Sequence, residues 1–316
     1  MQYNRIPIAF AFDNNLVFPA CICLSSLMMH ANVDTYYDIF ILHSEKENLC
    51  RAELDKLPTF YPNCRIQYRK VGSIFDNAFE IRGITTPAYY RLLIPELIPE
   101  YDKVIYSDVD VIFRMDLMEL YSQELGCNYI AATRDLGLNF GKDGIAYIRS
   151  IPELHEGDYI QSGFIVINNK VIKKDGMVDT FKKIAQRKLK YQDQDTLNIA
   201  CYGKIKYLPL QYNMTDYSFE YAVKHLNILE RIFTKEEITL SLKSGNLHFN
   251  GHKPWKKYCV NFDIWWEYYR KSPYYDSKFY FDFFYGKLDE FDQLSFIKRV
   301  KILIRYFIYG KRKIKQ

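Results

Sequence analysis

Strand-like and helix-like segments alternate along the first third of this chain, and this alternation constrains its fold more than any other feature. Residues 6–12 read IPIAFAF and predict a strand, and residues 16–30 are long enough for a helix. Such alternation is typical of βαβ units, so we expect an α/β fold with a Rossmann-like, mostly parallel sheet. The pattern predicts further strands at 37–43, 65–71, 103–113, 129–133 and 160–168, and helices at 45–57, 86–97, 178–189 and 194–202.

The composition is that of a globular protein, because 48% of the 316 residues are hydrophobic and 26% are charged. The seven cysteines include no C-x-x-C pair, which argues against a disulfide scaffold or a zinc site and indicates a reduced, cytoplasmic protein. No segment reaches the roughly 18 uncharged apolar residues of a membrane-spanning helix. Residues 6–12 are too short for a signal-peptide core and run directly into Asp13.

Basic residues are concentrated at the C-terminus. The last 24 residues carry eight of them and no acid, and because the whole chain has a net charge of +5, the first 292 residues carry −3. This distribution argues against nucleic-acid binding and predicts one contact of the tail with a polyanion. Residues 291–309 alternate apolar and basic side chains at helical spacing, and 291–313 predict a basic amphipathic helix. Such a helix either lies on an anionic membrane surface, which would make the protein peripheral on the inner face of the cytoplasmic membrane, or packs on the domain.

The character of the sequence changes near residue 258. Residues 265–286 are dense in aromatic side chains and lead into the basic tail, with no clear linker before them. We therefore predict a catalytic domain at 1–258 and an aromatic-rich, basic helical extension at 259–316.

Two acids, Asp108 and Asp110, interrupt the apolar segment 103–113, with Val109 between them. On an extended segment residues two apart point the same way, so this pair can clamp a hard cation such as Mg²⁺ or Mn²⁺. Two acids in an apolar strand are costly to bury unless they bind something. The alternative is a strand that ends in a solvated turn. A D-x-D pattern also arises by chance, and Asp193-Gln194-Asp195 is a second copy.

The place of these acids in the predicted sheet also bears on function. Asp13 and Asp108 follow predicted strands, and α/β sheets bind ligands at the carboxyl ends of their strands. The chain contains neither G-x-G-x-x-G nor G-x-x-x-x-G-K. A nicotinamide-binding domain and a P-loop NTPase are therefore disfavoured.

The segment LHFNGHKPW (247–255) is a second candidate. His248 is a typical third ligand for such a metal, and Lys253 beside Gly251 is suited to phosphate. The alternative is a polar loop that Trp255 anchors in the core.

Two further segments carry weaker signals. Gly163 follows Gln161 and Ser162 at the start of an apolar strand and permits close approach of a ligand to the backbone. Asp193 lies near the start of a predicted helix, where it acts as an N-cap, as a functional acid, or as both.

Five short segments in this order resemble glycosyltransferase family 8, which contains bacterial lipopolysaccharide galactosyl- and glucosyltransferases and glycogenin. The resemblance covers roughly residues 6–256 and implies a GT-A fold with one nucleotide-sugar site. It implies transfer of a hexose, galactose or glucose, from a UDP-sugar with retention of the anomeric configuration. The segments are IPIAFAFDNN, Tyr90-Arg91-Leu92 before YDKVIYSDVDV, QSGFIVIN, YQDQDTLN and HFNGHKPW.

The resemblance also implies roles for single residues. Asp193 and Gln194 would lie at the reacting sugar as the catalytic pair. Asp108, Asp110 and His248 would bind Mn²⁺ or Mg²⁺. The remaining donor-binding positions implied are Ala11, Phe12, Asp13 and Asn15 at the uracil and ribose, Arg91, Val109, Gln161, Ser162 and Gly163 along the donor, and Gly251 and Lys253 at the pyrophosphate.

The chemistry of such a reaction agrees with these residue types. The leaving group is UDP, and a divalent metal and a lysine stabilise the charge that develops on it. Retention leaves two routes open, a covalent intermediate or attack of the acceptor hydroxyl on the same face as the departing UDP. We favour same-face attack because the amide oxygen of Gln194 is a weak nucleophile.

Three positions depart from the family pattern. Gln161 stands where many members have Asn, and Leu16 stands where many have Tyr. The loop 248–253 is one residue shorter than in familiar bacterial members, which leaves the partner of Lys253 open and makes His252 an alternative.

Two other functions compete with a glycosyltransferase. A haloacid-dehalogenase-type phosphatase also carries D-x-D, but on its first strand and with a later acidic pair that this chain lacks. A decayed sugar-binding module is disfavoured because Asp108, Asp110, Asp193 and His248 are all present. The expected partners are a UDP-hexose donor and a saccharide or lipid-linked saccharide acceptor of lipopolysaccharide, capsule or another surface glycan, and no nucleic acid.

Overall fold

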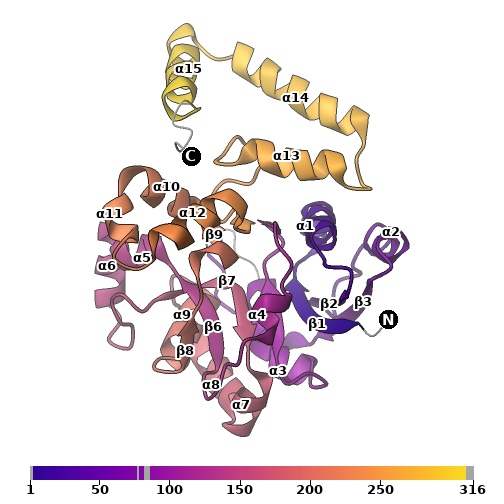
Figure 1. Cartoon of the computed structure of the whole chain (residues 1–316), viewed down its shortest axis with the longest axis vertical. Coiled ribbons are helices and arrows are strands. Elements are labelled where there is room, and N and C mark those ends of the chain that lie inside the picture. Colours follow the sequence, from indigo (N-terminus) through magenta and orange to yellow (C-terminus); the bar gives the residue numbers. More distant parts are fainter. Residues whose placement is uncertain (1–2, 77, 82–85, 311–316) are drawn as a thin grey trace.

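A seven-stranded sheet lies at the centre of the chain, whose computed structural model describes residues 3–76, 78–81 and 86–310 (Figure 1). The strand order is β3-β2-β1-β4-β7-β6-β8. Strand β7 runs antiparallel to both neighbours and the other six share one direction, which confirms the mostly parallel sheet. The strands are β1 (Asn4–Ala11), β2 (Thr35–Ser44), β3 (Cys64–Val71), β4 (Val104–Ser107), β6 (Ile130–Arg134), β7 (Ile160–Ile167) and β8 (Ile205–Tyr207).

Helices cover both faces of this sheet, which is why the strands inside it, unlike the edge strands β3 and β8, are mostly buried. Ile8 and Phe10 of β1 point into one core, and Ala9 and Ala11 point into the other. The first face carries α1 (Val17–Met29), the 3₁₀ helix η2 (Leu54–Lys56), α2 (Leu57–Phe60) and α4 (Met118–Ser122). The second carries the 3₁₀ helix η4 (Thr86–Leu93), α3 (Ile94–Leu97), α7 (Asn169–Lys174), α8 (Met177–Ala185) and α9 (Gln192–Ala200).

A small second sheet joins segments that are far apart in sequence. Strand β10 (Leu247–His248) pairs antiparallel with β5 (Val111–Ile112) and parallel with β9 (Met214–Thr215). It places the predicted histidine beside the predicted aspartates. The surrounding elements are α5 (Leu136–Phe140), α6 (Lys142–Arg149), α10 (Asp216–Lys224), α11 (Leu226–Leu229), α12 (Lys235–Ser244) and the short 3₁₀ turns η1 (Asn14–Leu16), η3 (Ser73–Phe75) and η5 (Leu210–Tyr212).

Three of the predicted elements differ from the structure. The helix predicted at 45–57 is wrong over most of its length, because the Asn14 side chain accepts from Cys50 N and donates to the Asn48 carbonyl, groups that a helix would need. The helix predicted at 86–97 is a 3₁₀ helix followed by one α-turn, since Pro95 lacks the N–H that would continue it. The strand predicted at 103–113 stops at Ser107, and its last part joins the second sheet.

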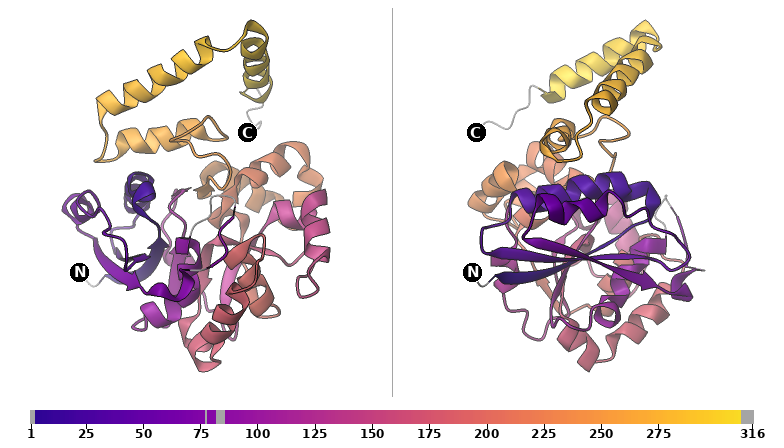
Figure 2. Two further views of the ribbon diagram at one scale, coloured as in Figure 1. Left: turned by 180° about the vertical axis from the view of Figure 1, so that it is seen from behind. Right: turned by 90° about the vertical axis from the view of Figure 1, so that its right-hand side faces the viewer.

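Three helices follow the part of the chain that carries the sheets (Figure 2). Trp265 and Trp266 of α13 (Phe262–Lys271) are buried in a core shared with α1 and β5. Helices α14 (Ser277–Asp292) and α15 (Phe296–Gly310) stand beyond α13, away from the sheets. None of the described helices is both long and apolar enough to cross a bilayer. The domain boundary at 258/259 stays a prediction.

Candidate active site

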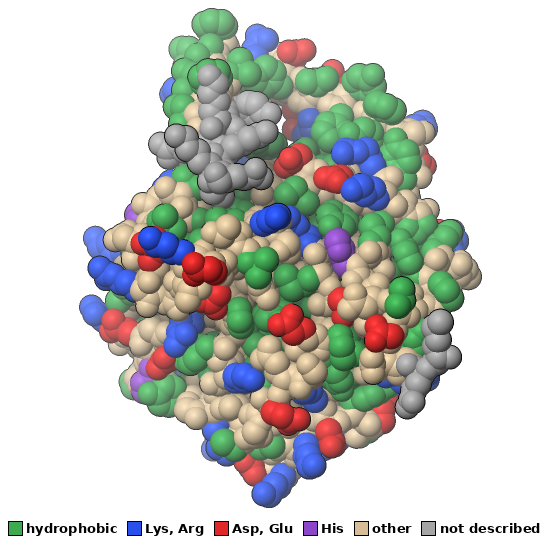
Figure 3. Space-filling model, viewed as in Figure 1, with side chains coloured by type: hydrophobic (Ala, Val, Ile, Leu, Met, Phe, Trp, Pro, Cys, Tyr) green, Lys and Arg blue, Asp and Glu red, His purple; other side chains and the backbone are tan. Residues whose placement is uncertain are grey.

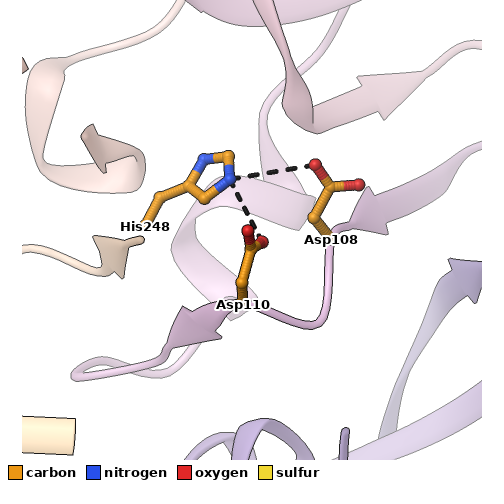
Figure 4. A group of neighbouring side chains, drawn as sticks. All are labelled: Asp108, Asp110 and His248. Atoms are coloured by element: carbon orange, nitrogen blue, oxygen red, sulfur yellow. Dashed lines mark ion pairs between the residues drawn. The ribbon is translucent and has the colours of Figure 1, made fainter. Parts of the chain in front are cut away.

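Three potential metal ligands meet where the two sheets adjoin (Figure 4). Asp108 and Asp110 lie on the bend between β4 and β5, and pairing with Val111 brings His248 over this bend. His248 Nε2 lies 3.2 Å from Asp110 Oδ1 and 3.8 Å from Asp108 Oδ2. The ligand atoms of the three residues all lie within 4.8 Å of one another. The two acids therefore face one point although they sit on a bend and not on an extended strand.

A chain of hydrogen bonds orients the ring of His248. The backbone N–H of Gly163 and the Nδ2 of Asn213 each donate to Gln161 Oε1 at 2.7 Å. This orients Asn213 so that its Oδ1 accepts from His248 Nδ1 at 2.9 Å. Because an amide oxygen only accepts, Nδ1 is the nitrogen that donates this hydrogen bond, and Nε2 is the nitrogen that faces the two aspartates. Such orientation by an outer group is typical of histidine metal ligands.

The electrostatics of these three residues favour a bound cation. Asp110 Oδ1 is buried, and no group in the described part of the chain donates a hydrogen bond to it. His248 Nε2 lies 3.2 Å from this oxygen and is placed to be a second ligand of a cation bound there. Two carboxylates and an imidazole suit Mn²⁺ or Mg²⁺. The residues therefore fit a divalent metal.

Lys253 places a positive charge beside the same group. Its ammonium forms an ion pair with Asp110 Oδ2 and donates to the Phe249 carbonyl at 2.6 Å. Although burial opposes ionisation of Asp110, this ammonium holds the pKa of the carboxyl well below its usual range. Asp110 is thus a carboxylate at neutral pH. The Lys253 side chain is partly exposed and is accessible to an anion.

Gly163 allows β7 to pass close to the metal-binding side chains. Asp108 N donates to the Gly163 carbonyl at 2.7 Å. A Cβ at position 163 would collide with the His248 ring and with Asp108 Oδ2. The absence of a side chain at Gly163 thus lets two of the metal-binding side chains pack on the backbone, and the approach of a ligand to this glycine stays a prediction.

Arg91 is buried between two acids, with only 4% of its side chain exposed. One terminal nitrogen donates to Asp108 Oδ1 at 2.8 Å, and Nε lies 3.1 Å from Asp193 Oδ2. The other terminal nitrogen donates to the carbonyl and the hydroxyl of Ser162 at 2.7 and 3.0 Å. The guanidinium thus joins the end of β4 to the start of α9, and its contact with the donor stays a prediction.

The pKa of Asp193 gives a prediction for stability. Burial raises the pKa of this carboxyl from 3.8 to about 6, although Arg91 acts in the opposite direction. Between these values the folded protein holds a proton that the unfolded chain has released. The free energy of unfolding therefore falls as the pH rises through this window. We expect Asp193→Asn to make this fall shallower by about 1–3 kcal/mol in urea denaturation with chelator present.

The control for this prediction is Asp179→Asn, because that side chain is 91% exposed. It should leave the pH profile unchanged. A profile of Asp193→Asn as steep as that of the wild type would contradict the raised pKa of Asp193.

Both polar atoms of the Gln194 side-chain amide form hydrogen bonds. Its Oε1 accepts from Ser162 N at 3.0 Å, and its Nε2 donates to Asp135 Oδ2 at 3.3 Å. Asp135 follows β6, and burial raises the pKa of its carboxyl. The orientation of the amide is therefore fixed by a backbone donor.

Asp193 is not an N-cap, which corrects one of the two expectations for it. The residue before α9 is Tyr191, and its backbone N–H donates to Asp195 Oδ2 at 2.8 Å. Tyr147 and Tyr159 donate their hydroxyls to the same carboxylate at 2.6 and 2.5 Å. Asp195 thus supports the first turn of α9, and Asp193 is left to pair with Arg91 and Ser162.

The residues predicted for the nucleotide lie at the carboxyl end of β1. Pairing of Ala9 with Tyr106 brings this end beside that of β4. Asp13 Oδ1 accepts from Asn15 N at 2.9 Å and shapes the turn. The side chains of Ala11, Phe12 and Val109 are buried, so only their backbone groups remain for a ligand.

Gly251 lies in the loop after β10, against α10. A Cβ on this residue would lie 2.5 Å from Asp216 Oδ2. The loop that carries Lys253 is therefore in contact with the first residue of α10.

Asn213 and Asp135 are the main side chains of the site that sequence reasoning missed. Asn213 is 2% exposed and orients His248. Its only local signal is an Asn-x-Thr pattern that has no bearing on this role. Asp135 follows a strand at the ligand-binding edge, as Asp13 and Asp108 do, and that position could have identified it.

Known proteins resemble this chain over most of its length. The family model of Glycosyl transferase family 8 matches residues 7–259. Glycosyltransferase GlyE of Streptococcus pneumoniae is 25% identical over 85% of this chain and 62% of GlyE. Lipopolysaccharide 1,2-glucosyltransferase of Escherichia coli K12 is 24% identical over 80% of this chain and 73% of that protein.

Solved structures show the same fold. The galactosyltransferase LgtC, solved with donor and acceptor sugar analogues, aligns with a TM-score of 0.71 and 25% identity over 86% of this chain and 98% of LgtC. The bifunctional glycosyltransferase WbbM aligns with a TM-score of 0.71 and 23% identity over 87% of this chain and about half, 51%, of WbbM. The fold is GT-A, and the family match includes every predicted site residue. This chain belongs to glycosyltransferase family 8.

Proposed function

We propose that this protein transfers a hexose, galactose or glucose, from a UDP-sugar to a saccharide acceptor with retention of configuration, using Mn²⁺ or Mg²⁺. The observation that carries the proposal is the triad of Asp108, Asp110 and His248 with Nε2 turned toward the two carboxylates. Lys253 and Gly251 lie on its α10 side, and Asp193 and Gln194 at the start of α9. A metal and a diphosphate are thus expected beside the groups that face the sugar.

Some residues of the site would act on the leaving group and others on the sugar. A bound divalent metal would supply positive charge at the two phosphates. Lys253, freed from Asp110, would hold phosphate oxygens where charge develops as UDP leaves. Asp193 would place a carboxylate near the sugar carbon as it becomes cationic. Arg91 would keep that carboxylate and Asp108 in place.

The held amide of Gln194 supports same-face attack over a covalent intermediate. Its oxygen accepts from Ser162 N and would have to break this bond to reach the sugar. A phosphate oxygen of UDP would then accept the acceptor's proton. A glycosyl adduct on Asp193 or Gln194, trapped by rapid quench and found by mass spectrometry, would overturn this route.

A donor panel tests the proposed function. Purified protein is incubated with UDP-glucose, UDP-galactose and UDP-N-acetylglucosamine, with Mn²⁺ or with chelator, and UDP release is measured. We expect metal-dependent release from one hexose donor. UDP binding without release from any donor, also when acceptors are supplied, would support the decayed binding module, and neither binding nor release would contradict both functions.

We also propose that α14 and α15 dock on an anionic membrane surface, where the acceptor would be a lipid-linked saccharide of a surface glycan on the cytoplasmic side. Helix α15 leaves its apolar face uncovered, with Phe296 74% and Phe307 59% exposed. Lys298 and Lys301 are exposed beside that face. Apolar side chains gather over these helices at the top of the molecule (Figure 3). The exposed apolar residues are Phe279, Phe281, Tyr285 and Leu288 of α14 and Phe296, Ile297, Ile302, Leu303, Ile304, Phe307 and Ile308 of α15.

The exposure of those side chains supports the membrane surface over the alternative, in which this helix packs on the domain. The basic residues Lys311, Arg312, Lys313 and Lys315 that contribute to the predicted tail lie outside the described residues.

Flotation with liposomes tests the membrane surface. We expect the full chain to float with vesicles of phosphatidylglycerol and phosphatidylethanolamine, less so at high salt, and a chain ending at Asp289 to stay in the soluble fraction. Phe296→Ser/Phe307→Ser should reduce flotation while the basic residues remain. Equal behaviour of the intact and shortened chains at low salt would contradict the proposal.

A further inference from the structure

The side-chain oxygen of Gln161 accepts hydrogen bonds from two parts of the fold. One donor is the backbone N–H of Gly163 in the same strand, β7, and the other is Nδ2 of Asn213, just before β9. Both side chains are buried, with Gln161 7% and Asn213 2% exposed. A backbone N–H only donates, so it determines that the oxygen of this amide, and not its nitrogen, lies here. Oε1 of Gln161 is therefore occupied by groups of the protein itself.

This oxygen decides which way the Asn213 amide faces. Because Gln161 Oε1 only accepts, Asn213 turns Nδ2 toward it, and its Oδ1 is left for His248 Nδ1 at 2.9 Å. In the reverse orientation Nδ2 would donate to Nδ1, and the proton of a neutral ring would lie on Nε2. That nitrogen faces Asp108 and Asp110, and a ring nitrogen that carries a proton has no lone pair for a metal.

The length of the Gln161 side chain is what lets it bond to both donors. Asparagine in its place would be shorter by one C–C bond, about 1.5 Å. Its oxygen could still accept from Gly163 N–H, since asparagine readily bonds to the N–H two residues on. It could not at the same time keep the 2.7 Å bond to Asn213. Gln161 thus links β7 of the central sheet to the small sheet that carries His248.

We propose that Gln161 is a positioning residue for the metal ligand His248, and that it acts through Asn213 and not through a contact with the donor sugar. The inference rests on the proposed function, which supplies the divalent metal.

A double-variant cycle tests this role through the affinity for Mn²⁺, measured by electron paramagnetic resonance on the full chain with and without UDP. Asn213→Leu keeps the branched shape but no longer orients His248, and we expect about 10- to 100-fold weaker Mn²⁺ binding. Gln161→Asn should weaken binding about 3- to 10-fold, the effect of one hydrogen bond. In Gln161→Asn/Asn213→Leu the change at 161 should add nothing further, because its partner is gone.

The matched control is Gln67→Asn, which shortens a glutamine on the edge strand β3, where its oxygen accepts from Arg69. It should bind Mn²⁺ as the wild type does. Circular dichroism and thermal unfolding with chelator show whether Asn213→Leu is folded, and if it is not, Asn213→Ala takes its place.

Three results would overturn the proposal. One is wild-type Mn²⁺ affinity in Gln161→Asn, with the loss confined to the KM for the UDP-sugar, which would make Gln161 a donor contact. Another is an equal effect of Gln161→Asn with and without Asn213. The third is no Mn²⁺ binding by the wild type when UDP is present. Absence of UDP release in the donor panel, with Mn²⁺ bound as expected, would instead contradict the proposed function.

Discussion

Asp110→Asn is expected to lower metal-dependent UDP release and sugar transfer by roughly 100- to 1,000-fold. The change removes one negative charge from the three ligand residues and turns an ion pair with Lys253 into a neutral contact. It also puts an N–H₂ or a neutral oxygen in place of Oδ1, the buried atom that no described group satisfies. Because volume and fold are nearly preserved, the loss should appear in activity and in Mn²⁺ affinity, measured by electron paramagnetic resonance.

Asp179→Asn makes the same chemical change on an exposed surface. It should leave both the activity and the Mn²⁺ affinity as in the wild type. The Asp110→Asn variant also distinguishes a loss of metal binding from a loss of stability. Weaker Mn²⁺ binding with normal thermal stability would identify Asp110 as a ligand. Unchanged Mn²⁺ affinity in Asp110→Asn would contradict the metal site.

Arg91→Met is expected to lower the free energy of unfolding by about 3–5 kcal/mol. The methionine fills much of the same volume but leaves Asp108 and Asp193 facing each other without a cation. Burial already raises the pKa of Asp193, so loss of the guanidinium removes the group that opposes this shift. Arg91→Lys should recover only part of the loss, since one ammonium cannot reach Ser162 and both acids together. Urea denaturation of the metal-free protein measures the effect.

Arg149→Met is the matched control. Arg149 pairs with Glu156 through two nitrogens, but its side chain is 67% exposed, and we expect no resolvable loss of stability. In the double variant Arg91→Met/Asp193→Asn one of the two uncompensated charges is gone, so stability should partly return. If Arg91→Met lowered the free energy of unfolding no more than Arg149→Met does, the buried ion pairs of Arg91 would contribute little to stability.

Local sequence patterns identified the elements with a clear period and a simple boundary. The apolar segments at β1, β2 and β7 are strands because they are buried on both faces of one sheet. The helix predicted at 45–57 is wrong because a side chain thirty-odd residues away, Asn14, binds the backbone groups that would have closed it. No pattern within that segment contains this information.

The candidate active site also has a part that the sequence predicted and a part that it did not. Residue type and spacing alone identified Asp108, Asp110 and His248 as a candidate metal set, since two acids in an apolar segment and a histidine beside glycine and lysine are unusual locally. The sequence did not show that the Asn213 amide oxygen accepts from His248 Nδ1, or that Arg91 lies between two acids. Each of these contacts joins segments that only the packing of the two sheets and their helices brings together. The sequence therefore determined which chemical groups the chain carries and where most of its regular elements run. The tertiary structure decided which charged groups interact with one another, because desolvation and close contact depend on neighbours in space.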